Sequence, residues 1–348
     1  MKKFLSMIAS LSILAASLAA CGSASTPAAT TAATTAATTA ATTAAAAAET
    51  QGREYKVAIV QQLDHASLDE IRVAIEAELD AKAAEKGIAI TYKDFNGQND
   101  ATVLNQIGAQ VVSDGYDAII PIATLAATTM ATATEDNQIP VIYAAISDPA
   151  EAQLTGISNV TGTSDALNTP FILDMMLKAN PDIETVGLLY SNSEANSVTP
   201  IKQAKEYLDS KGIAYLEKTG NSTDEILTAA SSLVGRVQAV FTPTDNVVMA
   251  AASAVAEILN EAGIPHYAGA DSFVTAGAFA TRGVNYTELG TYTADMAVDI
   301  LLGGAVPEYH VMDGGIITVN TDTAAKLGID YSVFKNMAGT VKEVTTQE

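Results

Sequence analysis

The sequence Lys56-Val-Ala-Ile-Val-Gln-Gln-Leu-Asp-His65 begins a strand–loop–helix–strand unit that extends to Phe95 and decides the fold. Its apolar run up to Gln61 is bounded by polar residues, which is typical of a buried strand. A helical pattern follows from Leu68 to about Ala84 and ends at Lys86-Gly87, a helix stop signal. Residues 88–94 then predict a second strand.

The same order returns in the second half of the chain. Residues 186–190 predict a strand, a helical pattern ends at Lys211-Gly212, and residues 213–217 predict the next strand. Even the tetrapeptide Lys-Gly-Ile-Ala recurs, at Lys86 and Lys211, 125 positions apart (211 − 86). This recurrence predicts two similar α/β lobes, each large enough to hold a core of its own.

Strands alternate with helices throughout both halves, which indicates parallel sheets covered by helices on both faces. The predicted elements include a strand at residues 141–145, a helix at residues 246–262 and a short helix from Asp271 to Gly277. The predicted fold class is therefore α/β, with two similar doubly wound parallel-sheet lobes joined by a multi-strand hinge. The sequence after residue 286 exceeds what one lobe needs, so we expect it to return to the first lobe and cross back again. The predicted segments are a signal peptide (1–20), a linker (21–52), a first lobe (53–163 and 287–312), a second lobe (164–286 and 313–335) and a C-terminal tail (336–348).

The N-terminus has the layout of a secretory signal. Lys2 and Lys3 precede an apolar run of residues 4–18, which is too short for a comfortable transmembrane helix. Leu18-Ala-Ala-Cys21 resembles the bacterial lipoprotein box, in which the cysteine is acylated; a plain secretory peptide is the alternative. Residues 22–52 are almost entirely Ala, Thr and Ser, so we expect a disordered tether between the membrane and the folded body.

Charge and composition exclude several classes of function. The formal net charge is −22, and removal of Lys2 and Lys3 makes it −24 (16 basic minus 40 acidic residues). Such a surface repels nucleic-acid phosphates and anionic lipid, so we expect no nucleic-acid partner. Cys21 is the single cysteine and the three histidines are far apart in sequence, so neither a disulfide, a metal site nor a cofactor is expected.

Polar loops follow the predicted strands and mark the expected site. Ligands of open parallel sheets bind outside the carboxyl ends of the strands, where loops and helix N-termini converge. The relevant loops are residues 62–68, 123–125 and 145–148 in the first half, and 191–197, 242–246 and 269–272 in the second. They contain carboxylates, hydroxyls and amides but no Lys or Arg. This composition favours a zwitterionic amino acid, whose carboxylate would bind backbone N–H groups and hydroxyls near Thr124, Thr163, Ser164 and Ser193.

Several runs resemble a known family. Asp64-His-Ala-Ser-Leu-Asp69, Ser147-Asp-Pro149, residues 159–165 (Asn-Val-Thr-Gly-Thr-Ser-Asp), residues 187–197, Thr244-Asp-Asn246 and Gly277-Ala278 carry the likeness. From Lys56 to about Tyr331 the chain is similar to ABC transporter substrate-binding lipoproteins of the type I periplasmic-binding-protein fold. Within these it resembles the family that includes binders of tryptophan and other aromatic amino acids. The resemblance implies capture of a small ligand by hinge closure between two lobes.

Loop position and resemblance together give a set of candidate ligand-binding residues. These are Asp64, His65, Leu68, Thr124, Ala145, Ser147, Asp165, Ser193, Glu194, Asn196, Thr244, Asp271 and Tyr286. Either Asp165 or Asp271 is the expected partner of the ligand ammonium group. Each position has a structural alternative; Asp245, for example, could serve only as a helix N-cap.

The predicted function is that of an extracytoplasmic receptor, anchored through Cys21 to the outer face of a bacterial cytoplasmic membrane. We expect a monomer that delivers an aromatic or hydrophobic amino acid to an ABC permease and is not an enzyme. Three alternatives remain open: a nucleoside or sugar ligand, a receptor for a sensor kinase, and a secreted hydrolase. A hydrolase would need a nucleophile beside a base, and His65 with Ser67 is the one nearby pair, without a Gly-x-Ser-x-Gly motif.

Overall fold

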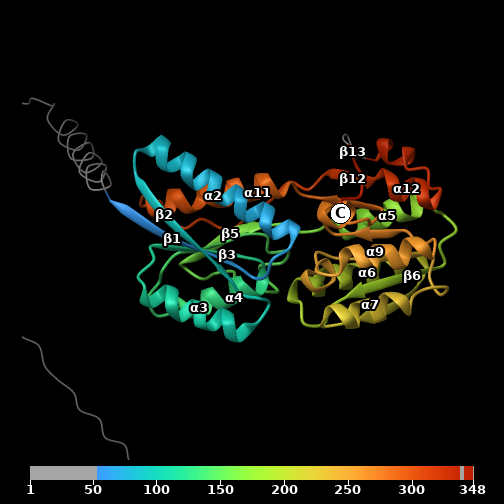
Figure 1. Ribbon diagram of the computed structural model, residues 1–348, viewed down its shortest axis with the longest axis horizontal. Helices are drawn as coiled ribbons and strands as arrows, with labels where there is room; N and C mark the ends of the chain where they lie inside the picture. The colour runs from blue at the N-terminus through green and yellow to red at the C-terminus, as the bar shows by residue number, and fades with distance from the viewer. Residues whose placement is uncertain (1–52, 338–340, 348) are drawn as a thin grey trace, which may run out of the picture. The chain divides into compact units, whose positions relative to one another are not determined.

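The computed structural model describes residues 53–337 and 341–347, which form two α/β lobes, as predicted (Figure 1). The sheet of the first lobe has the order β11-β5-β4-β3-β1-β2, and all its neighbouring strands are parallel. Its strands are β1 (Glu54–Gln61), β2 (Ala89–Asn96), β3 (Ala118–Ile122), β4 (Val141–Tyr143), β5 (Val160–Ser164) and β11 (His310–Val311).

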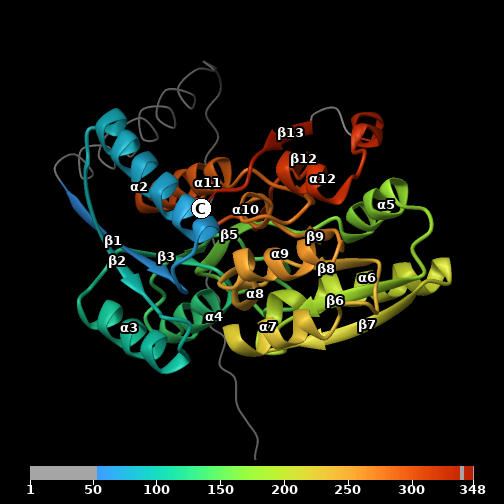
Figure 2. The ribbon, with the colours of Figure 1, turned by 45° about the vertical axis from the view of Figure 1, so that its right-hand side comes forward.

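The sheet of the second lobe has the order β13-β12-β10-β9-β8-β6-β7, and Figure 2 shows β9, β8, β6 and β7 side by side. Its strands are β6 (Thr185–Tyr190), β7 (Ala214–Thr219), β8 (Ala239–Thr242), β9 (His266–Ala268), β10 (Ala280–Gly283), β12 (Ile316–Asn320) and β13 (Val341–Val344). The pair β10–β12 is antiparallel and the other pairs are parallel.

Helices cover both faces of each sheet. In the first lobe they are α2 (Ala66–Lys86), α3 (Ala101–Ser113), α4 (Thr124–Ala133) and α11 (Tyr286–Leu301). In the second they are α5 (Thr169–Ala179), η1 (Ala195–Ser197), α6 (Val198–Lys211), α7 (Thr223–Ser231), α8 (Asn246–Met249), α9 (Ala252–Glu261), α10 (Asp271–Thr275), α12 (Thr321–Leu327) and η2 (Ser332–Asn336).

The buried side chains form three apolar clusters. One lies between the first sheet and α3 and α4, and a second lies between the second sheet and α5 and α6. The third includes residues of α2 and α11 in the first lobe and of α7, α9 and α10 in the second. Leu68 and Phe273, from opposite lobes, both belong to this third cluster, so the apolar core continues across the boundary between the lobes.

Three segments connect the lobes. Residues 165–168 lead from β5 to α5, residues 284–285 lead from β10 to α11, and residues 312–315 lead from β11 to β12. Asp165, Val284 and Gly314, one from each segment, line the same small hollow, so the segments lie close together. This arrangement is the multi-strand hinge that the sequence predicts.

Most predicted elements are present, and the differences have local causes. The strand predicted for residues 141–145 ends at Tyr143, because Ala145 has a left-handed backbone with φ of 59°. The helix predicted for residues 246–262 is divided into α8 and α9 by a turn at residues 250–251. Gly87 and Gly212 end their helices in left-handed conformations, as the stop signals predict.

The structure describes the two ends of the chain less completely than the lobes. The predicted signal segment, Cys21 and the linker up to residue 52 lie outside the described residues. The predicted tail, 336–348, includes strand β13, which pairs with β12 over Val341–Val344. Within the described part of the chain, no helix has the length and apolar character needed to cross a membrane.

A close contact between α11 and α2 gives a stability prediction. A Cβ atom at Gly290 of α11 would lie 2.6 Å from the carbonyl oxygen of Ile71 and 2.8 Å from Cβ of Ala74, both in α2. We expect Gly290→Ala to lower the free energy of unfolding by about 1–2 kcal/mol, because overpacking outweighs the gain in helix propensity. Urea unfolding measures this, with the exposed Asp299→Ala of the same helix as control; an unchanged midpoint for Gly290→Ala would contradict the tight contact.

Candidate functional site

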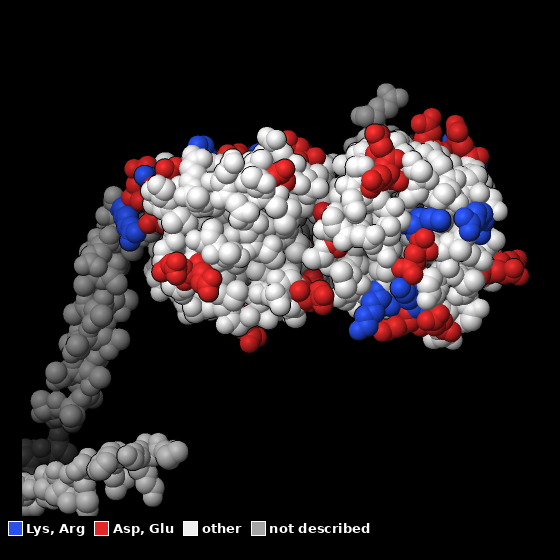
Figure 3. Space-filling model, turned by 90° about the horizontal axis from the view of Figure 1, so that it is seen from below, with Lys and Arg blue, Asp and Glu red and all other residues white. Residues whose placement is uncertain are grey.

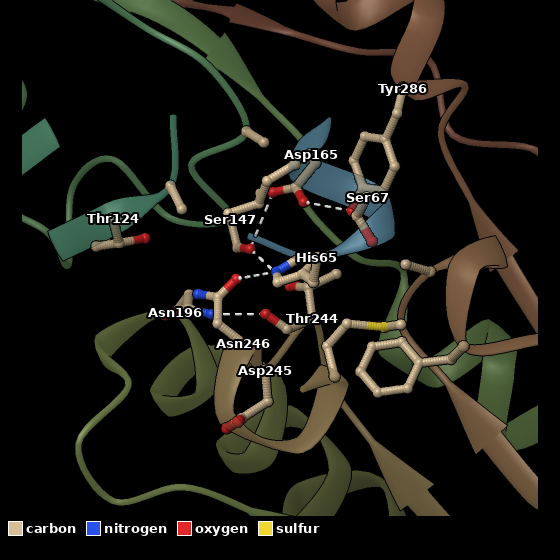
Figure 4. A pocket seen from close by; sticks show the side chains of 16 residues that line it. His65, Ser67, Thr124, Ser147, Asp165, Asn196, Thr244, Asp245, Asn246 and Tyr286 are labelled. Atoms are coloured by element: carbon tan, nitrogen blue, oxygen red, sulfur yellow. Dashed lines mark hydrogen bonds between the residues drawn. The ribbon is translucent and has the colours of Figure 1, made fainter. Parts of the chain in front are cut away.

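The candidate site is a pocket where the carboxyl ends of strands from both lobes face each other (Figure 4). The space between its side chains is about 360 Å³, including the part that opens to solvent. The pocket is lined by His65, Ser67, Leu68, Ala123, Thr124, Ala145, Ser147, Asp165, Asn196, Thr244, Asp245, Asn246, Met249, Ala270, Phe273 and Tyr286.

The structure brings most of the predicted site residues to this pocket. They are His65, Leu68, Thr124, Ala145, Ser147, Asp165, Asn196, Thr244 and Tyr286. The other four predicted residues do not line it. Asp64 and Ser193 are exposed, and Asp271 forms an ion pair with Lys342 at 3.2 Å. Glu194 is buried beside the pocket and directs its carboxylate into a polar network.

Several lining residues are absent from the predicted set. Ala123, Asp245, Asn246 and Ala270 lie in the predicted loops, whereas Met249 and Phe273 lie one turn into the short helices that follow. A helix of four or five residues shows no apolar periodicity, so the signal for Met249 and Phe273 is weak. Asp245 caps α8 by accepting from the backbone N–H of Val248 at 3.0 Å, which confirms its N-cap role.

Asp165 is the central polar group of the pocket. Its carboxylate accepts hydrogen bonds from the hydroxyls of Ser147, at 2.9 Å, and Tyr286, at 3.0 Å. The residue is 3% exposed, and no Lys or Arg of the described residues forms an ion pair with it. Burial raises the pKa of Asp165, although the two hydrogen bonds act in the opposite direction. A cationic group of a ligand would compensate for this buried charge.

Polar contacts cross from one lobe to the other around the pocket. Ser147 and Thr244 share a hydrogen bond of 2.9 Å between their hydroxyls, and Ser67 and Ser272 are paired through theirs. At the rim, Thr199 donates to the carboxylate of Asp148 at 2.7 Å. These contacts hold the two lobes against each other on both sides of the pocket.

The main chain is strained at two lining positions. Ala123 follows β3 with φ of 75°, and Ala145 follows β4 with φ of 59°. Left-handed backbone is unfavourable for residues other than glycine and persists where the surrounding structure fixes it, often at binding sites. Ala123 is the N-cap of α4, so its conformation directs the N-terminus of that helix, with Thr124, toward the pocket.

One wall of the pocket is apolar. Leu68, Met249 and Phe273 supply its large side chains, and Ala123, Ala145 and Ala270 add small ones. Phe273 is fixed by an edge-to-face contact with His266, with ring centroids 6.3 Å apart. Among residues 53–337 and 341–347, no His, Cys, Asp and Glu side chains are grouped as a metal site requires.

A buried acidic pair lies behind the polar wall. The pKa of Glu194 is raised to about 7. Burial is the largest cause and the charge of Asp245 the second, whereas a hydrogen bond from Asn246 acts in the opposite direction. Burial also raises the pKa of Asp245. Between about pH 4.5 and 7, Glu194 therefore keeps a proton in the folded state that it has lost in the unfolded state. Stability falls as the pH rises through this window.

We expect Glu194→Gln to remove this pH dependence. Relative to the variant, the wild-type protein should lose on the order of 3 kcal/mol of unfolding free energy between pH 4.5 and 8. Urea unfolding at several pH values measures the difference, with Glu151→Gln, at an exposed position, as control. If the unfolding free energies of wild type and Glu194→Gln change with pH in parallel, the pKa of Glu194 is not raised in the folded protein.

On the face shown in Figure 3, the Lys and Arg side chains of the described residues lie among Asp and Glu and are not gathered into a basic patch. Ion pairs such as Lys205–Glu217, at 3.0 Å, also place basic side chains beside acidic ones. The surface in this view offers little to a polyanion.

Comparisons with known proteins agree with this architecture. The family model described as ABC transporter substrate binding protein matches residues 56–338. A curated tyrosine-binding protein from Clostridioides difficile (strain R20291) is 31% identical over 303 residues, which cover 85% of this chain and 86% of the relative.

Two solved structures add information on conformation. The complex of an ABC domain with L-Trp from Streptococcus pneumonia has a TM-score of 0.77 at 30% identity, covering 83% of this chain and 100% of the other. A substrate-binding protein with adhesive properties from Clostridium difficile, in its ligand-free, open form, has a TM-score of 0.64 at 32% identity, covering 84% and 100%. The structure is thus more similar to the L-Trp complex than to the open form.

The family model covers most of the chain, and the two lobes, the hinge and the pocket between them have the arrangement that capture of a solute requires. The protein belongs to the family of ABC transporter substrate-binding proteins.

Proposed function

We propose that this protein captures an aromatic amino acid between its lobes and delivers it to an ABC permease. Asp165 carries the proposal, because a buried carboxylate that forms no ion pair with a Lys or Arg of the described residues suits the ammonium group of an amino acid. The N-terminus of α4 and the hydroxyl of Thr124 supply donors for the ligand carboxylate.

The apolar wall supports an aromatic side chain. Leu68, Met249 and Phe273 offer an apolar surface on which a ring can pack. The tyrosine-binding relative and the relative solved with L-Trp point to the same ligand class. The greater similarity to the L-Trp complex than to the ligand-free, open relative agrees with capture by hinge closure.

The hydrolase alternative receives no support from its candidate residues. The hydroxyl of Ser67 is paired with Ser272, and Nε2 of His65 lies 3.0 Å from Oδ1 of Asn246. Neither contact joins the serine to the histidine, as a nucleophile and its base require. The proposed role is therefore binding and release of an unchanged ligand, which NMR of the ligand recovered after incubation would verify.

We expect tyrosine and tryptophan to raise the melting temperature of the protein, because they bind the folded state alone. Asp165→Asn should weaken their binding at least about 30-fold, since it removes the charge that faces the ammonium group. Asp271→Asn should leave the affinity unchanged, because that carboxylate is paired with Lys342 outside the pocket. Calorimetry at pH 7.5 measures each affinity.

Nucleosides and sugars tested in parallel separate the ligand classes. If a nucleoside or a pentose stabilises the protein and no amino acid does, the amino-acid proposal is rejected, but the proposed role as a solute receptor is retained. Equal affinities in wild type and Asp165→Asn would reject Asp165 as the ammonium partner. The melting temperature of the ligand-free variant shows that it is folded, and we expect it not to fall, because a buried charge has been removed.

We also propose that the mature protein is anchored at the outer face of the cytoplasmic membrane by acylation of Cys21. More than one acyl chain gives stable membrane binding, so Cys21→Ala should move the protein from the membrane fraction to the soluble fraction of the cell envelope. Immunoblots of the two fractions, with metabolic labelling by a fatty acid, test this. A labelled, membrane-bound Cys21→Ala protein would reject the assignment.

A further inference from the structure

Two buried polar atoms of pocket-lining side chains have no hydrogen-bond partner among the described residues. They are Nδ1 of His65 and Oδ1 of Asn196, which belong to opposite lobes. Both residues are labelled at the pocket in Figure 4. Buried polar groups are almost always paired, so a ligand that occupies the pocket is expected to satisfy these two atoms.

The neighbours of Asn196 fix the orientation of its amide group. Its Nδ2 donates to the main-chain carbonyl oxygen of Thr244 at 2.6 Å. A carbonyl oxygen can only accept, so the amide nitrogen must face it. Oδ1 of Asn196 is therefore an acceptor, and it requires a hydrogen-bond donor.

A chain of hydrogen bonds fixes the tautomer of His65, and it begins at a main-chain donor. The N–H of Leu125 can only donate, and it donates to Oε1 of Gln62 at 2.9 Å. Nε2 of Gln62 consequently donates to Glu194 at 3.1 Å, across the lobe boundary. At pH 8, above its pKa of about 7, Glu194 is ionised, so its carboxylate also accepts from Nδ2 of Asn246 at 2.6 Å.

The last bond in this chain reaches the imidazole. Because Nδ2 of Asn246 faces Glu194, Oδ1 of Asn246 faces His65 and accepts from its Nε2–H at 3.0 Å. Burial lowers the pKa of His65 and favours the neutral ring, although Asn246 and nearby carboxylates oppose this shift. A neutral imidazole with its proton on Nε2 has a lone pair on Nδ1, so this atom is also an acceptor.

We propose that His65 and Asn196 form a subsite that recognises a hydrogen-bond donor on the side chain of the ligand. The inference rests on the proposed function, in which the charged acceptor Asp165 takes the ammonium group. Two neutral acceptors then suit a neutral donor, such as the hydroxyl of a phenol or the N–H of an indole. The subsite selects tyrosine and tryptophan over phenylalanine, and Asn246 is the positioning residue that holds the tautomer of His65.

Calorimetry with the three aromatic amino acids tests the subsite at pH 8, with the full chain in a Cys21→Ala background. We expect tyrosine or tryptophan to bind at least about 100-fold more tightly than phenylalanine, because phenylalanine leaves buried acceptors unpaired. Asn196→Leu and His65→Phe should reduce this ratio at least tenfold. They should do so by weakening the donor-bearing ligand more than phenylalanine.

Asn192→Leu is the matched control, because Asn192 is exposed, lies in the same loop and bonds only to Thr219 among the described residues. A second measurement does not depend on any variant being stable. Nitrogen-15 NMR of the imidazole should show the Nε2–H tautomer in the wild-type protein, and a shift of Nδ1 when the preferred ligand binds. Asn246→Leu should populate the other tautomer and lower the selectivity.

The possible failures are distinguishable. Equal affinity for all three amino acids, with binding still dependent on Asp165, would overturn the subsite and keep the proposed function. The Nδ1–H tautomer in the wild-type protein at pH 8 would overturn it as well. Absence of binding by every amino acid would reject the proposed function and this inference together.

Discussion

The carboxylate of Asp165 is the interaction on which the site depends. It lies at the first connection between the lobes, and its two hydrogen-bond partners come from different places, the loop after β4 for Ser147 and the start of α11 for Tyr286. Ser147 is in turn bonded to Thr244 in the second lobe. The carboxylate of Asp165 therefore links the hinge, both lobes and the pocket. Because this carboxylate is buried, binding of a ligand cation beside it is favoured.

The position of this charge follows from the topology of the two sheets. Parallel strands place all their carboxyl ends at one edge, and the repeated unit does this once in each lobe. The hinge then sets the two edges face to face. Polar side chains that are far apart in sequence, such as His65 and Asn246, meet at this junction at hydrogen-bond distance.

Sequence alone predicted the fold and the loops that make the site, because apolar periodicity and glycine stop signals are local features. It did not predict the direction of each side chain. Asp271 is the first residue of α10, as expected, but its partner Lys342 comes from β13, a strand within the region assigned to the tail. Glu194 lies in a predicted loop, yet it faces Gln62 and Asn246. Such contacts depend on tertiary neighbours that no short stretch of sequence specifies.

The apolar cluster that continues from one lobe into the other has a consequence for release. Separation of the lobes would bring water to Leu68 and Phe273, which costs free energy whether or not a solute is present. This contribution favours the closed arrangement of the lobes even when the pocket is empty. Release of the solute at the membrane then requires a docking partner that binds the separated lobes more tightly than the closed ones. Its contacts would compensate for the free-energy cost of exposing these apolar side chains to water.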